Sequence, residues 1–319
     1  DYTTLSAQGP ATAGTPFSRR VGTLDNAALY GQGSLWVGPA TRIVLGVRTQ
    51  RHRDRLTEEV FPADDRSAKR RLNAYELATR HAFGSGWAAT GRVGRSFRTA
   101  NFDDNACFFP PCAPQLLAPQ VADTGELALE YEHAGLRARA SAYAMQLRDE
   151  IYYSPLVFAN VNLSPTERRG LELQGGWRAG RTLEFDASIA WLEARFRSGT
   201  YGGVDVSGKD VPLVPSAIAT ATAAWRFAPR SRLNASLRWV GPQRYDNDQA
   251  NTFSRKQPSY ALAGLKLEHR MGPWEFALEA SNLFDRKYYS YGVWDFGASF
   301  SAFPAPGRAV FASLAWRAD

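Results

Sequence analysis

Histidine, acidic and cysteine side chains are the groups in this sequence that could carry out metal or acid–base chemistry. The four histidines are spread along the chain at His52, His81, His133 and His269. None lies at the close spacing of a metal-binding HxxxH motif, and no GxSxG nucleophile motif lies near them. We therefore expect no catalytic residue, no metal site and no cofactor.

We expect structural roles for the clustered aspartates and for the two cysteines. Asp103, Asp104, Asp246 and Asp248 have the density of a calcium-binding loop without its regular spacing, so we expect solvated or turn-forming side chains. Cys107 and Cys112 lie in a proline-rich stretch where they could close a small ring. We expect a disulfide there that staples a loop, which implies an oxidising compartment.

Composition excludes several classes of protein. The chain has 319 residues, 44% of them hydrophobic, and a net charge of +7. No run of about 18 uncharged apolar residues is present, so a helical membrane protein is excluded. The basic residues are spread rather than clustered, which argues against nucleic acid as a partner. Residues 1–10 lack the features of a secretory signal, so we expect a mature chain or a fragment.

A period of two residues is the dominant pattern. Leu171, Leu173 and Trp177 alternate with polar residues, as in a strand with one apolar side. The same alternation recurs at these segments: 127–131, 183–191, 233–239 and 274–280. The sequence therefore predicts an all-β protein.

Turn-forming residues divide the chain into about 14 strands. We expect them at 1–8, 27–37, 41–56, 69–83, 86–98, 123–133, 136–154, 166–179, 181–197, 216–228, 232–246, 259–271, 274–294 and 308–318. Their connections alternate between short turns and loops of about ten residues or more. Antiparallel transmembrane β-barrels of outer membranes have this asymmetry.

Tryptophan positions provide a second test of a barrel. Six of the nine lie close to short turns or to the end of the chain: Trp36, Trp87, Trp177, Trp225, Trp274 and Trp316. In a membrane they would form the aromatic girdle of one rim. The alternative is a soluble β-sandwich whose indoles close the core, but strands as long as 136–154 exceed the usual sandwich strand.

Several motifs together resemble one family. Residues 96–101 (SFRTAN) resemble the "fRxPn" stretch of TonB-dependent outer-membrane receptors, and residues 282–289 (NLFDRKYY) are similar to their "NLFDxxYY" signature. Pro306, Gly307 and Arg308 resemble the "PGR" that opens the last strand of these receptors. Between these motifs, residues 149–151, 160–162, 169–172 and 211–215 occur in the family's usual order.

The resemblance implies an architecture as well as a fold. Members have an N-terminal plug within a 22-stranded barrel. We expect residues 1–319 to be one domain, the C-terminal portion of such a barrel, because nothing in the sequence resembles a plug or a TonB box. Fourteen strands leave two unpaired edges, so the barrel is either completed elsewhere or closed at a smaller size. The ending Trp316-Arg317-Ala318-Asp319 departs from the family's usual aromatic terminus.

The resemblance also implies a function. It indicates an outer-membrane receptor and transporter of Gram-negative bacteria for a metal chelate, either a siderophore-type iron complex or cobalamin. Its partners would be that chelate, outer-membrane lipid and, through the N-terminal region, the energising TonB complex. A passive porin-like channel is the alternative. An outer-membrane hydrolase is disfavoured because no serine and histidine motif is present.

Contacts with a chelate would come from the long loops and nearby strand ends. Aromatic side chains there can cover an apolar chelate while Arg or Lys offsets negative charge. The candidates are Tyr152, Tyr153, Tyr201, Tyr245, Tyr291, Trp294 and Phe296, followed by Phe300 and Phe303. Residues 282–289 are expected to be structural, and Arg168, Arg169 and Glu172 to solvate a wet inner wall.

Overall fold

The structure is a computed structural model that describes residues 2–7, 16–58, 65–105 and 116–317. Within these residues the secondary structure consists of strands and turns. No helix of the described chain is long and apolar enough to cross a membrane. Cys107 and Cys112 lie outside the described residues, so the expected disulfide stays a prediction.

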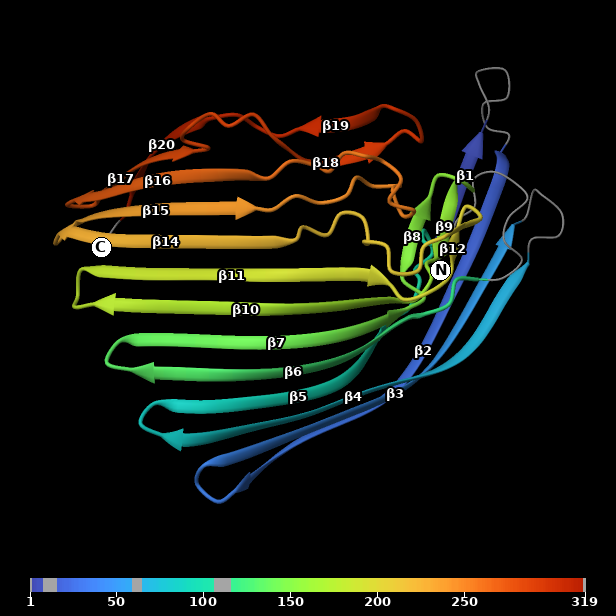
Figure 1. Ribbon diagram of the computed structural model, residues 1–319, viewed down its shortest axis with the longest axis horizontal. Helices are drawn as coiled ribbons and strands as arrows, with labels where there is room; N and C mark the ends of the chain where they lie inside the picture. The colour runs from blue at the N-terminus through green and yellow to red at the C-terminus, as the bar shows by residue number, and fades with distance from the viewer. Residues whose placement is uncertain (1, 8–15, 59–64, 106–115, 318–319) are drawn as a thin grey trace.

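Fourteen strands form one antiparallel sheet in which each strand pairs with the next large strand along the chain (Figure 1). This confirms the predicted fold class and strand number. The strands in order are β1 (Tyr2–Ala7), β2 (Pro16–Val37), β3 (Thr41–Glu58), β4 (Arg66–Gly84), β5 (Trp87–Arg98), β6 (Gln120–His133), β7 (Leu136–Arg148), β10 (Thr166–Ala179), β11 (Leu183–Phe196), β14 (Ala217–Ala228), β15 (Ser231–Val240), β16 (Tyr260–Met271), β17 (Trp274–Ser281) and β20 (Ala309–Trp316).

Three small hairpins lie at the end of the sheet that carries the long loops (Figure 1). They are β8 (Ile151–Ser154) with β9 (Ala159–Asn162), β12 (Thr200–Tyr201) with β13 (Val204–Asp205), and β18 (Tyr289–Trp294) with β19 (Phe300–Pro304). The opposite end is closed by tight turns. At one of them, Ala134 and Gly135 both have positive φ, the geometry of a two-residue hairpin turn.

Three strands end well before their predicted bounds, and one begins well before its predicted start. The predicted strand 232–246 ends at Val240. The predicted strands 136–154 and 274–294 were each expected to be continuous, but they break after Arg148 and Ser281. The next residues, Asp149 and Asn282, have φ of 56° and 44°, which a strand does not allow. Strand β2 begins at Pro16 rather than at residue 27.

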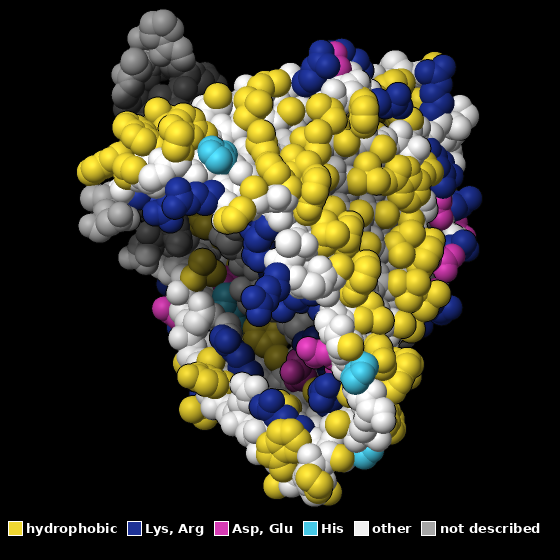
Figure 2. All heavy atoms as spheres, turned by 90° about the vertical axis from the view of Figure 1, so that its left-hand side faces the viewer, with side chains coloured by type: hydrophobic (Ala, Val, Ile, Leu, Met, Phe, Trp, Pro, Cys, Tyr) yellow, Lys and Arg dark blue, Asp and Glu magenta, His cyan; other side chains and the backbone are white. Residues whose placement is uncertain are grey.

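The two faces of the sheet have opposite chemistry. Large apolar side chains are exposed on the outer face, for example Leu127 at 71% and Leu171 at 57%. The opposite face carries charged residues such as Glu130 and Arg139, and Figure 2 shows cations and carboxylates in a hollow bordered by apolar side chains. A water-soluble sandwich would bury its large apolar side chains, so the soluble alternative is excluded.

Five of the six tryptophans near short turns belong to the outer apolar face. Register places Trp87 opposite Tyr131, Trp177 opposite Phe185, and Trp274 opposite Trp316. Trp225, opposite Leu183, lies on the same face. These exposed indoles form the predicted aromatic rim.

Trp36 is an exception to the predicted rim. It pairs with Arg42, which pairs with Arg80, and Arg80 forms an ion pair with Glu130 on the inner face. Alternation therefore turns Trp36 toward the charged side of the sheet. Proximity to a turn locates a residue along a strand but does not specify its face.

The inner wall near the short turns is a network of paired charges. A recess of about 530 Å³ is lined by Arg80, Glu130, Arg137, Arg139 and Asp186. Arg139 contacts Glu130, and Arg137 contacts Asp186. Each cation there faces a carboxylate, so the wall is hydrated and close to electrically balanced.

The sheet ends on two edges. β1 pairs only with the first part of β2, through Tyr2 opposite Gly22 and Ala7 opposite Pro16. Within the described chain, no ladder joins β20 to β1, and residues 23–37 of β2 have a paired neighbour only in β3. These edges present backbone N–H and C=O groups that pairing would satisfy.

Candidate functional site

Long connections bring three distant segments together at one end of the sheet. They are the β8–β9 hairpin, the connection from β15 to β16, and the β18–β19 hairpin. The connection includes Tyr245-Asp246-Asn247-Asp248, which begins five residues after β15 ends at Val240. We call this region the loop end.

Asp246 joins the three segments of the loop end. Its carboxylate accepts hydrogen bonds from the hydroxyls of Tyr152 at 2.6 Å and Tyr291 at 2.7 Å. Its backbone N–H donates to Gly292 O at 3.0 Å, and its carbonyl accepts from Trp294 N at 3.0 Å. A single residue of the connection thus fastens both hairpins.

Phenols of the loop end are held in the neutral form. Burial, followed by the hydrogen bond to Asp246, raises the pKa of Tyr291 to about 12 and raises that of Tyr152 still further. Burial also raises the pKa of the Tyr201 hydroxyl, which lies 2.9 Å from Ser154 Oγ. The hydroxyls of Tyr152 and Tyr291 therefore remain hydrogen-bond donors to Asp246 at neutral pH.

Tyr245 is part of an aromatic core within the loop end. It is 1% exposed, and its hydroxyl lies 2.6 Å from that of Tyr289. Its ring centroid lies 4.6 Å from Phe300 and 5.4 Å from Phe253. Tyr245 and Phe300, both predicted to be candidate ligand contacts, therefore pack against protein in this structure.

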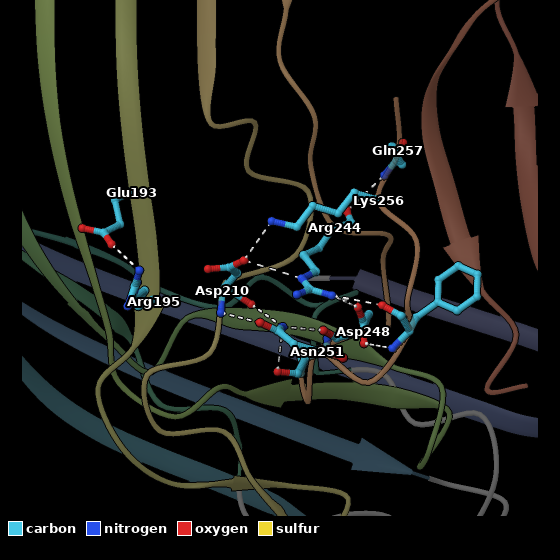
Figure 3. A network of polar contacts seen from close by, with 10 residues as sticks. Glu193, Arg195, Asp210, Arg244, Asp248, Asn251, Lys256 and Gln257 are labelled. Atoms are coloured by element: carbon cyan, nitrogen blue, oxygen red, sulfur yellow. Dashed lines mark hydrogen bonds and ion pairs between the residues drawn. The ribbon is translucent and has the colours of Figure 1, made fainter. Parts of the chain in front are cut away.

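A buried ion pair stabilises the connection itself (Figure 3). Arg244 Nη1 contacts the fully buried Asp248 at 3.1 Å and donates to Phe253 O at the same distance. Asp210, from the connection between β13 and β14, contacts Arg244 at 3.5 Å and Lys256 at 3.2 Å. Of the two roles expected for Asp248, solvated or turn-forming, the structure shows the second, because its carboxylate is buried and accepts a hydrogen bond from Phe253 N.

A second apolar cluster supports the other side of the loop end. Its buried members are Leu163, Ala194, Phe196, Val206 and Val211, with Tyr152, Tyr201, Val161 and Val214 packed against them. This packing buries part of the surface of Tyr152 and of Tyr201. It also fixes the rings whose hydroxyls contact Asp246 and Ser154.

The remaining candidates present aromatic surface to solvent. Tyr153 is 51% exposed, Phe296 46% and Tyr291 38%. Tyr291 packs against the exposed Phe303 at 5.3 Å between ring centroids, and Trp294 packs against Phe296 at 5.3 Å. The β18–β19 hairpin thus presents these two aromatic pairs, whereas Tyr153 lies on β8.

Sequence reasoning missed the residue that organises this region. Asp246 was expected to be solvated or turn-forming, and the pattern gave no reason to single it out from other aspartates. The only available signal was its position between Tyr245 and Asn247 at the end of a strand. Within the described residues, no group of three or more His, Cys, Asp or Glu side chains could hold a metal ion.

A sheet with an apolar exposed outer face, a charged inner face and long loops at one end defines a membrane β-barrel architecture. The chain matches the family model "TonB dependent receptor-like, beta-barrel" over residues 1–283. The chain belongs to that family, whose members are transporters of the Gram-negative outer membrane rather than enzymes.

This chain matches only part of the length of each curated relative. The pesticin receptor of Yersinia pestis is 25% identical over 249 residues, which are 74% of this chain and 34% of that receptor. The chain thus spans about a third of the curated relatives that it matches.

Solved structures show the same fold. The ferric yersiniabactin uptake receptor FyuA from Yersinia pestis has a TM-score of 0.76 at 19% identity, covering 96% of this chain and 47% of that chain. The siderophore receptor PiuA from Acinetobacter baumannii has a TM-score of 0.75 at 18% identity, covering 94% and 44%. The copper transporter OprC has a TM-score of 0.72 at 17% identity, covering 94% and 48%.

Proposed function

We propose that the chain is the C-terminal barrel portion of a receptor that imports a metal chelate, either a siderophore-type iron complex or cobalamin. The observation that carries this proposal is the exposed aromatic surface of the β18–β19 hairpin, which includes the Tyr291–Phe303 pair. Asp246 holds this hairpin in place through its hydrogen bond with the Tyr291 hydroxyl. Exposed aromatic rings suit the apolar body of a chelate, and the neighbouring connection contributes exposed Arg255 for its negative charge.

Energy for import would come from the TonB complex, as the family membership suggests. Contact with that complex and displacement of a plug would involve segments other than the sheet described above. The names of similar solved structures support a chelate as cargo, because they include a ferric yersiniabactin uptake receptor and a siderophore receptor. The shared fold does not distinguish among cargoes, since a copper transporter has it as well.

Uptake by whole cells tests this proposal. The receptor that carries this chain would be expressed in Gram-negative cells that lack their own chelate receptors. Radioactive iron bound to a phenolate siderophore and radioactive cobalamin would then be offered separately. We expect one of the two to accumulate, and deletion of the TonB gene to abolish its accumulation.

Matched variants connect uptake with the loop end. Replacing Tyr291 and Phe303 by Ala removes one exposed aromatic pair and should reduce chelate binding roughly fivefold or more. Phe227→Ala removes an exposed ring near the short turns and should leave binding unchanged. Equal losses in both variants would refute the assignment of the binding surface.

A passive channel is the alternative outcome of the same experiment. Its inner wall would be the balanced charged surface around Arg139 and Glu130. Uptake of several unrelated solutes without TonB, together with steady ion conductance in planar bilayers, would replace the receptor proposal with this one.

A further inference from the structure

The outer face of β3 and β4 carries an unusual group of cations beyond its apolar part. We call them the outer cation cluster, which consists of Arg51, Arg53, Arg55, Lys69 and Arg71. All five are exposed. Register places them on the same face as Leu45 and Leu77, which belong to the apolar outer surface. They therefore point away from the hollow of the sheet.

Distance along the strands places this cluster at the outer boundary of the membrane. Thr41 pairs with His81 beside the short turn, and Arg51 pairs with Arg71 ten residues farther along each strand. A tilted transmembrane strand needs about 9–11 residues to cross the hydrocarbon layer. Arg51 and Arg71 thus lie where the strands leave the hydrocarbon on the loop side, at headgroup level.

Within the part of the chain that the structure describes, no member of the cluster forms an ion pair with a carboxylate. Arg51 lies directly opposite Arg71, and Arg53 lies directly opposite Lys69, so like charges face each other across the strands. Such an arrangement is destabilising unless anions are nearby. The one side-chain hydrogen bond made by a cluster member within the described residues joins Arg71 Nε to Thr49 Oγ1 at 3.4 Å. Asp25, opposite Arg53 on β2, forms no ion pair within the described chain.

Outward-facing cations elsewhere near the loop end are paired. Arg169 was expected on the inner wall, but it lies on the same face as Leu171 and contacts Glu167 at 3.2 Å. Arg195 contacts Glu193 at 2.7 Å. Arg95 contacts Asp123 at 2.6 Å. Unlike these cations, the members of the outer cation cluster form no ion pair among the residues that the structure describes, although Asp25 lies opposite Arg53. This difference indicates that the anions of the cluster come from outside the protein.

We propose that the outer cation cluster binds the phosphate groups of the phosphorylated glycolipid in the outer leaflet of the outer membrane. Arginine guanidinium groups bind phosphate oxygens in a fork geometry, and the alternating strand presents several of them in a row. The acyl chains of the same lipid would lie along the apolar surface below, beside Leu45 and Leu77. One lipid molecule would thus contact both the outer cation cluster, through its phosphates, and the apolar surface, through its acyl chains.

Lipid binding by the purified receptor tests the proposal. The receptor in detergent would be titrated with bisphosphorylated lipid A, and bound lipid would be counted by native mass spectrometry. The test variant combines Arg53→Gln and Lys69→Gln, a cross-strand pair from the cluster. The control combines Arg169→Gln and Arg195→Gln, which removes two outward cations that have carboxylate partners.

Loss of two cluster cations should weaken lipid A binding roughly tenfold or more, while the control should bind like the unmodified receptor. Lipid A without phosphates should bind the unmodified receptor as weakly as phosphorylated lipid A binds the cluster variant. Equal binding by both variants would overturn the proposal. So would full competition by inorganic phosphate at the lipid's concentration, because the cluster would then be a site for free anions. Circular dichroism of each variant checks that the sheet is folded.

Discussion

Asp246 is a single acceptor shared by two phenols from hairpins that are far apart in sequence. A carboxylate that accepts hydrogen bonds from Tyr152 and Tyr291 satisfies both hydroxyls at once. Hydrogen bonds to a charged acceptor contribute more than neutral ones, about 1.5–3 kcal/mol each. The loop end therefore owes its shape to electrostatics as much as to packing.

This arrangement predicts late titration of the loop-end phenols. The folded-state pKa of Tyr291, about 12, lies above the ordinary value of about 10, so folding favours the protonated hydroxyl. Its contribution to stability is complete below pH about 10 and decreases as the pH rises through 12. Absorbance of tyrosinate during an alkaline titration should show a group of phenols that ionise after the exposed ones.

Asp246→Asn supplies the control for that titration. The amide can still accept a hydrogen bond but carries no charge, so the pKa of Tyr291 should fall toward its ordinary value. A single titration step near pH 10 in the unmodified protein would contradict this account of the loop end.

For single residues, the sequence predicted which aromatic side chains lie at the loop end better than it predicted what each of them contacts. Tyr152 and Tyr291 were expected at the loop end because aromatic residues follow long strands there, and both take part in it. Tyr245 was expected in the same group but is buried, because neighbouring Phe253 and Phe300 cover it. Such burial depends on contacts between distant segments, which composition and spacing do not encode.

Strand pairing depends locally on the absence of a side chain. On the inner face, Gly170 lies opposite Tyr143, and a Cβ at Gly170 would be 2.5 Å from Cε1 of that ring. The aromatic ring of one strand thus covers the glycine of its neighbour. Gly175 on the outer face has no such cover, since its nearest neighbour would be Arg137 O at 3.8 Å.

These two glycines provide a matched pair of substitutions. Gly170→Ala should destabilise the folded sheet by about 1–3 kcal/mol, because the Tyr143 ring must move. Gly175→Ala should be neutral or slightly stabilising, because alanine restricts the unfolded chain more than glycine does. Urea unfolding in lipid vesicles, followed by circular dichroism, measures both. Similar stabilities for the two variants would show that the ring can shift freely.

Strand positions were predictable because each strand repeats one alternation over about ten residues and ends at a turn signal. The errors have local causes. Asp149 and Asn282 adopt positive φ, and the Asn282 side chain accepts a hydrogen bond from Arg286 N at 2.8 Å, which ends β17. No Gly or Pro lies at either break, so those turn signals in the sequence do not reveal where these strands end.

The whole sheet is a curved wall with two edges rather than a closed cylinder. The last strand, β20, and residues 23–37 of β2 each have one paired side within the described chain. In hydrocarbon, every unsatisfied backbone group costs several kcal/mol. A membrane-inserted protein must therefore provide partners for both edges.

Hydrogen exchange on the membrane-inserted receptor tests this requirement. We expect the amides of β20 and of residues 23–37 to be protected as strongly as those of β10, which has neighbours on both sides. Rapid exchange confined to the two edges would contradict the expectation. The fold class and family were predictable at this scale from alternation and motif order, whereas the edge partners lie beyond what those patterns encode.

The bond between Tyr152 and Asp246 spans 94 positions of the chain. The main ladders join consecutive large strands, so the wall can grow one hairpin at a time from short-range contacts. Fixing residues so far apart costs entropy unless the intervening strands β10 to β15 already hold them close. Assembly therefore has an inherent order, in which the surface that would meet cargo is completed only after the wall beneath it.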